Sequence, residues 1–173
     1  MTDVDHNQMW MYYPGALKRM VDINLTDIVN KSKDLVVLMP SQPESFVKHL
    51  HEVVEFGVDF VFDPSFFVPN LTSKQIELGL ANAKIVFGND YEIGLMEKKT
   101  NRKLEDWVKG GITIVRTLGK NGSYIFNGGN VWEVPVAKPV QSVDPTGAGD
   151  AYRAGFLAGF IKGFELPVCG RMG

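Results

Sequence analysis

The chain has 173 residues, of which 45% are hydrophobic and 22% are charged, so it has the composition of a globular protein of about one domain. Its formal net charge of −2 and the absence of any extended Lys/Arg cluster argue against a nucleic-acid partner. The longest apolar stretch, residues 154–161, is far shorter than the ~20 residues that span a bilayer, so we expect no membrane partner.

The first 90 residues alternate between extended and helical patterns. Aromatic residues at 8–13 that stop at Pro14-Gly15 indicate a strand followed by a turn. A continuous apolar run such as 34–39 is typical of a parallel strand that is buried on both faces. The further elements expected in this part are a helix from Ser41 to Gly57, a strand at 58–62, a helix that begins at Thr72, and a strand at 84–88.

Two of these helices carry the spacing of a capping box, Ser41 with Glu44 and Thr72 with Gln75. The first helix contains His49 and His51, which lie two residues apart and therefore on different faces. They cannot share a metal ion, and we expect both at the surface.

The second half predicts a change of strand direction. Helical pieces at 90–98 and 103–109 precede a strand at 112–118. Turn signals at 120–122 and 127–129 then surround two short strands, at 123–126 and 131–134, which indicates antiparallel hairpins. The whole order predicts one α/β domain, with a doubly wound, mostly parallel sheet, helices on both faces and an antiparallel hairpin edge.

Residues 144–150, Asp-Pro-Thr-Gly-Ala-Gly-Asp, open into an apolar helix pattern at 151–163. Gly147 and Gly149 leave backbone N–H groups uncovered at a helix N-terminus, where the helix dipole attracts phosphate. Asp150 follows in the first turn, where a carboxylate beside bound phosphate can accept a proton from an attacking hydroxyl. Taken singly, a turn glycine and an aspartate that complements the dipole are ordinary features; together they predict phosphoryl transfer.

Three further positions follow predicted strands. Asn89 and Glu92 could supply oxygen ligands to Mg²⁺, or could form a capping box without any metal. The segment Thr117-Leu-Gly119-Lys-Asn-Gly122 is explained by a hairpin turn alone. Asp63 before Pro64 is equally consistent with a turn and with a site residue at the end of its strand.

The residues 144–150, together with Ala154-Gly155-Phe156-Leu157, resemble the C-terminal signature of the PfkB/ribokinase family of sugar and nucleoside kinases. The resemblance extends over nearly the whole chain and implies an ATP-dependent transfer of phosphate to a primary hydroxyl of a sugar or nucleoside. Arg153 departs from the ribokinase-type pattern and is similar to the adenosine-kinase-like subgroup, although an exposed helical arginine explains it as well.

The resemblance also implies a role for each site residue. Asp150 would be the general base, and the Gly147, Ala148 and Gly149 amides would stabilise the transferred phosphate. Asn89 and Glu92 would organise Mg²⁺. The other expected roles are ATP binding by Thr117, Gly119 and Gly122, an Asp63 side chain that faces the nucleotide and substrate cleft, and a monovalent cation such as K⁺ held by Asp144 and Thr146.

Two family parts are missing from the 173 residues: an N-terminal substrate and lid part with a Gly-Gly motif, and a C-terminal cation-binding loop. We therefore expect a fragment truncated at both ends, inactive by itself, whose full-length form would allow a homo-oligomer. Gly155, Gly159 and Gly163 recur every four residues and predict a groove that such missing elements would cover.

Two other classes of function compete with a kinase. One is a nucleotide-binding or interaction domain without catalysis. The other is a dinucleotide oxidoreductase, which would require Gly-x-Gly-x-x-Gly between a strand and a helix, and no stretch supplies it. The single Cys169 excludes an internal disulfide, and the acidic N-terminus lacks the features of a signal peptide, so we expect a cytoplasmic protein.

Overall fold

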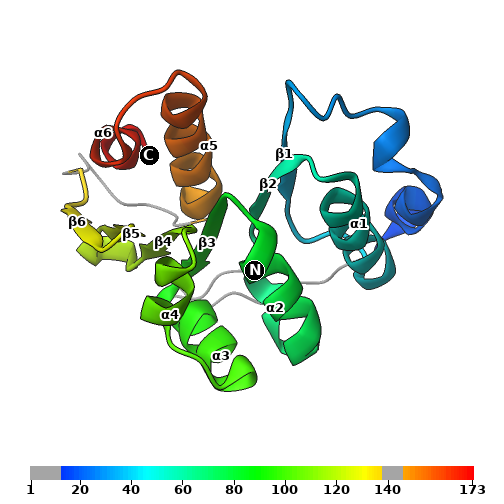
Figure 1. The fold of residues 1–173 in the computed structure, drawn as a ribbon, viewed down its shortest axis with the longest axis horizontal. Helices are drawn as coiled ribbons and strands as arrows, with labels where there is room; N and C mark the ends of the chain where they lie inside the picture. The colour runs from blue at the N-terminus through cyan, green and yellow to red at the C-terminus, as the bar shows by residue number, and fades with distance from the viewer. Residues whose placement is uncertain (1–12, 138–145) are drawn as a thin grey trace.

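The structure, a computed structural model, describes residues 13–137 and 146–173. One six-stranded sheet has its strands in sequential order, with β1 to β4 parallel and β4, β5 and β6 antiparallel, which confirms the predicted mixed sheet (Figure 1). The strands are β1 (Leu35–Leu38), β2 (Asp59–Phe62), β3 (Ile85–Asn89), β4 (Thr113–Thr117), β5 (Ser123–Asn127) and β6 (Asn130–Val134). The strand predicted at 8–13 lies outside the described ranges except for Tyr13, which is not in a strand. Asp144 also lies outside the described ranges.

Helices cover both faces of the sheet, as predicted. Four of them pack over one apolar core, and two others pack over a second core on the opposite face (Figure 1). The first group is α1 (Pro43–Phe56), α2 (Ser73–Asn82), α3 (Asp90–Thr100) and α4 (Leu104–Lys109); the second is α5 (Ala148–Ile161) and α6 (Leu166–Met172). Short 3₁₀ helices occupy Gly15–Asp22 (η1), Leu25–Asp27 (η2), Ser65–Asn70 (η3) and Gly119–Asn121 (η4).

The N-termini of α1 and α2 differ in how they are capped. At α2, Thr72 and Gln75 form the predicted capping box. At α1, the predicted box between Ser41 and Glu44 is wrong. The helix begins one residue later, with Gln42 as N-cap and a proline in the first turn, and the Ser41 hydroxyl lies 3.1 Å from that of Ser45 instead. The proline supplies the helical φ angle without any side-chain cap.

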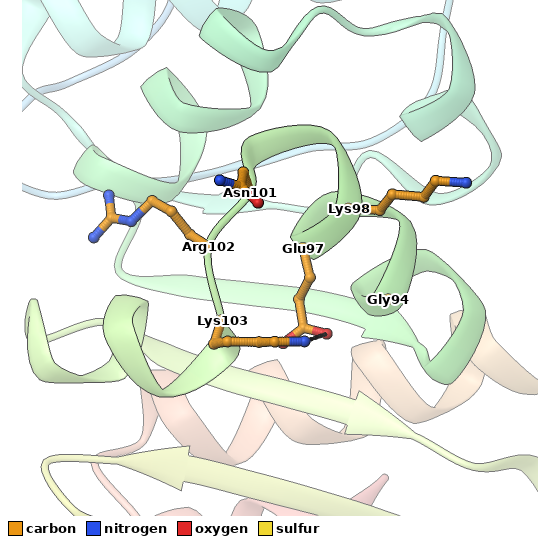
Figure 2. A pocket seen from close by; sticks show the side chains of 6 residues that line it. All are labelled: Gly94, Glu97, Lys98, Asn101, Arg102 and Lys103. Carbon is orange, nitrogen blue, oxygen red and sulfur yellow. Dashed lines mark ion pairs between the residues drawn. The ribbon is translucent and has the colours of Figure 1, made fainter.

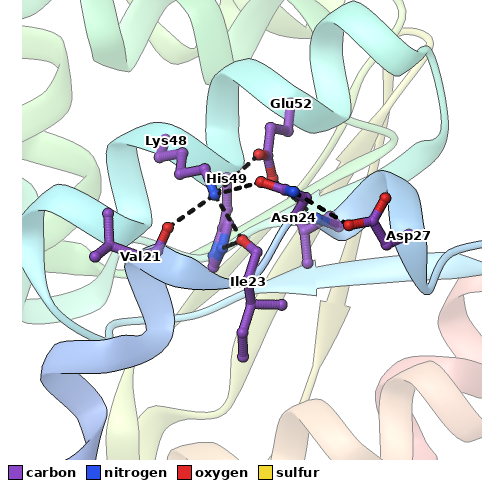
Figure 3. Close-up of polar contacts among 8 residues, drawn as sticks. Val21, Ile23, Asn24, Asp27, Lys48, His49 and Glu52 are labelled. Atoms are coloured by element: carbon purple, nitrogen blue, oxygen red, sulfur yellow. Dashed lines mark hydrogen bonds and ion pairs between the residues drawn. The ribbon is translucent and has the colours of Figure 1, made fainter.

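Helix α1 also holds the segment that precedes β1. The Lys48 ammonium donates hydrogen bonds to the carbonyls of Val21 and Ile23, at 2.8 and 2.7 Å, and forms an ion pair with Glu52 at 3.3 Å (Figure 3). His49 Nε2 lies 3.1 Å from the same Ile23 carbonyl. His49 is therefore buried, and its predicted place at the surface is wrong, because η1 and η2, which the sequence pattern did not indicate, cover it.

Helix α6 was not predicted, and it corrects the expectation of an uncovered groove on α5. A Cβ atom on Gly155 would overlap the Met172 carbonyl, and one on Gly159 would lie 2.9 Å from the Met172 sulfur. These small residues therefore let α6 pack closely on α5. Gly163 instead lies beyond the end of α5, where its φ of 75° turns the chain toward α6.

Candidate active site

The carboxyl ends of three parallel strands carry predicted site residues. Asp63 directly follows β2, Asn89 ends β3 and Thr117 ends β4. Asn89 and Thr117 are directly paired in the parallel register of β3 and β4. In an open α/β sheet this edge is where ligands bind, and here it lies next to the N-termini of α3 and α5.

A shallow groove of about 330 Å³ lies at this edge of the sheet. It is open to solvent and brings together residues of β3, the first turn of α3, and the turn after β4. The lining residues are Asn89, Asp90, Tyr91, Thr117, Leu118, Gly119 and Asn121. The structure thus places one predicted metal residue and two predicted nucleotide residues in the same groove.

Asn89 and Glu92 form a complete capping box at the start of α3. The Asn89 side chain accepts from the Glu92 N–H at 2.8 Å, and Glu92 Oε2 accepts from the Asn89 N–H at 2.7 Å. Glu92 is buried, and its other oxygen accepts a hydrogen bond of 3.4 Å from the hydroxyl of Ser65. Ser65 has a left-handed φ of 44°, a strained conformation that often occurs at functional sites. The cap that the sequence suggested as an alternative is therefore present, and it fixes this carboxylate near the groove.

The turn between β4 and β5 has the geometry of the expected hairpin. Leu118 accepts from Asn121 N–H at 3.1 Å, and the φ angles of Gly119 and Gly122 are 54° and 83°. The two glycines differ in their surroundings. A Cβ on Gly119 would meet no atom within 4 Å, whereas one on Gly122 would overlap the Val134 carbonyl. Gly122 thus shapes the turn, while Gly119 leaves open space beside the groove.

The N-terminus of α5 is exposed. Its N-cap, Gly147, has a φ of 80° and no side chain with which to cap the helix, and Ala148 and Gly149 are also exposed. The backbone amides of this first turn therefore face solvent beside a positive dipole end, as an anion site requires. Thr146 is exposed beside them.

Asp150 is joined to a buried carboxylate by an arginine. Arg153 Nη1 lies 3.0 Å from Asp150 Oδ1, and Arg153 Nη2 lies 3.3 Å from Asp63 Oδ1, while Arg153 Nε contacts Asp63 Oδ2. Asp63 is fully buried, and the arginine side chain is only 17% exposed. Arg153 is thus a half-buried partner of two acids, which corrects its interpretation as an exposed helical arginine.

Burial raises the pKa of Asp63 to about 7; the Arg153 guanidinium opposes this shift, and the charges of Glu92 and Asp150 add to it. Asp63 thus lies within electrostatic range of both other carboxylates. Burial likewise raises the pKa of Tyr152, whose hydroxyl lies 2.6 Å from that of Ser123 on β5.

A second hollow, of about 220 Å³, lies between the end of α3 and the start of α4 and contains none of the predicted site residues (Figure 2). Glu97 and Lys103 form an ion pair of 3.8 Å across it, and the side chains of Lys98 and Arg102 point away into solvent (Figure 2). We assign it no role.

The part of the chain that the structure describes contains no group of three or more His, Cys, Asp or Glu side chains that could hold a metal ion unaided. Asn89 and Glu92 supply oxygen atoms of the kind that Mg²⁺ prefers, and these oxygens also accept the hydrogen bonds of the α3 cap and of Ser65. No helix within residues 13–137 and 146–173 is long and apolar enough to cross a membrane.

The fold is that of an open α/β sheet with a glycine-rich helix N-terminus beside the carboxyl edge of its strands, the edge at which proteins of this class commonly bind ligands. The chain belongs to the pfkB family of carbohydrate kinases, which it matches over residues 1–173.

The curated relatives include nucleoside kinases and sugar kinases. The chain is 30% identical to the nucleoside kinase of Methanocaldococcus jannaschii over 173 residues, which are 99% of this chain and 56% of that protein. It is 34% identical to the nucleoside kinase of Methanothermobacter thermautotrophicus over 172 residues, 99% of this chain and 55% of that protein.

A solved structure of Burkholderia thailandensis nucleoside kinase in complex with inosine superposes with a TM-score of 0.90 at 29% identity, covering 98% of this chain and 55% of that one. The chain spans about half the length of these relatives.

Two residues of the site were missed from the sequence. Arg153 carried a usable signal, because its spacing of three residues from Asp150 places both on one helix face. Ser65 carried none, because its contact with Glu92 joins residues 27 positions apart.

Proposed function

We propose that this chain is the nucleotide-binding and phosphoryl-transfer part of an ATP-dependent kinase whose acceptor is a primary hydroxyl of a nucleoside or sugar. The observation that carries the proposal is the joint placement of an exposed helix N-terminus, with Asp150 in its first turn, and of a groove that contains Asn89, Thr117 and Gly119 at the same sheet edge. Family membership supports the reaction type.

In the proposed step, Asp150 accepts the proton of the acceptor hydroxyl. The hydroxyl oxygen forms a bond to the γ-phosphorus of ATP, the bond from that phosphorus to the bridging oxygen breaks, and ADP leaves. The amides of Gly147, Ala148 and Gly149 donate hydrogen bonds to the oxygens of the transferred group, where negative charge must be stabilised.

The other residues bind and orient the nucleotide. Thr117, Gly119 and Gly122 shape the wall on which ATP lies, and Asn89 with Glu92 would hold hydrated Mg²⁺ beside its phosphates. Bound there, the ion would supply neutralisation of phosphate charge. Asp63 acts indirectly, by holding the guanidinium of Arg153. The monovalent cation assigned to Asp144 and Thr146 remains a prediction, since Asp144 lies outside the described ranges.

Among acceptors, a nucleoside is favoured over a free sugar. Two curated relatives at 30% and 34% identity are nucleoside kinases, and the structural relative with a TM-score of 0.90 was solved with inosine. We also propose that the 173 residues alone do not transfer phosphate, because they span about half the length of those enzymes. A nucleotide-binding domain without catalysis is the second candidate.

The test uses the chain alone and the chain with any sequence that flanks it in its gene. Each is incubated with ATP, Mg²⁺ and adenosine, inosine, cytidine or ribose, and both ADP and phosphorylated acceptor are quantified. We expect equal amounts of ADP and nucleoside 5′-monophosphate from the longer form. Binding of ATP to both forms without any phosphorylated product would favour the second candidate.

A further inference from the structure

The contacts of the Arg153 side chain differ from those of an ordinary surface ion pair. Its guanidinium has two contacts with Asp63, which is fully buried at the end of β2, and a third with Asp150 on its own helix, at 3.0 Å. A planar guanidinium with two contacts to one carboxylate has a fixed orientation. The nitrogen that remains, Nη1, is therefore held at a defined place beside Asp150.

The residues around Arg153 make room for this arrangement. A Cβ atom on Gly149 would lie 3.0 Å from Arg153 Nη1, so a larger residue there would press on the guanidinium. The preceding residue, Tyr152, reaches in another direction and meets Ser123 on β5 at 2.6 Å. Successive residues of a helix project about 100° apart, so these two side chains tie the start of α5 to opposite parts of the sheet.

We propose that Arg153 is a positioning residue for phosphoryl transfer: anchored on the buried Asp63, it holds Asp150 by its Oδ1 atom and leaves Oδ2 to accept the proton of the acceptor hydroxyl. This inference rests on the proposed function, in which Asp150 is the base. Asp63 then contributes without touching the nucleotide, and Gly149 is required both for its amide and for the space that Arg153 occupies.

The kinetic test compares variants in the active form of the protein. Arg153→Met removes the charge and retains much of the length, and we expect it to lower kcat by about 10²-fold with KM for ATP within about threefold, because a misplaced reacting group typically costs that much. Arg153→Lys keeps the charge but cannot contact both carboxylates through one planar group. Its kcat should therefore lie between those of wild type and Arg153→Met. A kcat for Arg153→Met within threefold of wild type would overturn the proposal.

Two further variants separate positioning from mere stabilisation. Arg153→Met leaves Asp63 buried without its partner and should lower the melting temperature by roughly 10 °C, whereas Asp63→Asn/Arg153→Met should recover most of that loss. The double variant should not recover kcat, since Asp150 is still not held. The control, Tyr152→Phe, removes the contact between α5 and Ser123 on β5, and its kcat should stay within about threefold of wild type. Recovery of kcat together with stability would show that Arg153 is only structural.

A spectroscopic readout keeps this inference distinct from the proposed function. In ¹⁵N-labelled protein, the guanidinium signals of Arg153 should be sharp and slowly exchanging, and Asp150→Asn and Asp63→Asn should each shift them. This outcome supports the arrangement even if the wild type transfers no phosphate, a result that would contradict the function instead. Signals that neither substitution moves would overturn the proposed role of Arg153.

Discussion

The carboxylate of Asp63, at the end of β2, and the guanidinium of Arg153, on α5, form an ion pair between segments 90 residues apart in the sequence, with Nη2 and Oδ1 separated by 3.3 Å. It joins the layer of α5 and α6 to the parallel half of the sheet. The two residues are also the connection between the buried core and the exposed Asp150.

The first prediction concerns pH and stability. The pKa of Asp63 is raised to about 7 in the folded protein, from 3.8, so the folded state binds the proton more tightly than the unfolded state. The stability contributed by protonation is therefore present at low pH and is lost as the pH rises toward 7. Relative to Asp63→Asn, wild type should lose about 1 to 3 kcal/mol of unfolding free energy between pH 5 and pH 7.5 in urea titrations. No change over the same interval would show that Arg153 holds the folded-state pKa of Asp63 near or below its ordinary value.

Glu92→Gln should raise the Mg²⁺ concentration that gives the half-maximal rate, because one charge that organises the hydrated ion is removed. The matched control is Asp106→Asn, which removes a carboxylate from the equivalent capping position of α4, where Asp106 accepts from the Lys103 N–H at 3.2 Å. Both variants should lose at most about 1 kcal/mol of stability. If their magnesium titrations are identical, Glu92 is only a capping residue.

Gly155→Ala should destabilise the protein by about 1 to 3 kcal/mol, because its Cβ would overlap the backbone of Met172 and force α6 away from α5. Gly94→Ala is the control. Gly94 lies within α3 with no atom near the position of a Cβ, so the substitution should stabilise by about 0.5 to 1 kcal/mol through helix propensity. Denaturant unfolding measures both, and equal signs would contradict the close packing of α5 on α6.

The 173-residue chain by itself should associate. Strand β1 is at the end of the described sheet and pairs with β2 alone, and Val37 on it and Met39 just beyond it are 39% and 38% exposed. An open edge with apolar side chains favours pairing with another chain. Size-exclusion chromatography over a range of concentrations checks this expectation. Elution as a monomer at every concentration would contradict it.

The order of the elements could be predicted because each is encoded locally. Apolar runs and the capping box of α2 mark where strands and helices begin, so β1 to β6 and α1 to α5 were found near their observed bounds. Helix α6 and the 3₁₀ segments were not predicted from the sequence. They depend on tertiary contacts, such as the bonds from Lys48 that hold the segment before β1.

Site residues could be predicted where a residue of suitable chemistry lies at the end of a predicted strand. Asn89, Thr117 and Gly119 follow strands, and the parallel register brings them together. The role of Asp63 was left open because burial is not visible in a sequence, and it depends on Arg153, 90 positions away. The roles assigned to all of these residues stay predictions until variants are measured.

The central claim is that Asp150 is the general base, and Asp150→Asn tests it most directly. The substitution preserves shape and removes the proton acceptor, so in the active form kcat for nucleoside phosphorylation should fall by about 10² to 10⁴. The dissociation constant for ATP, measured by calorimetry on the same preparation, should stay within about threefold of wild type. Turnover within threefold of wild type would contradict the account.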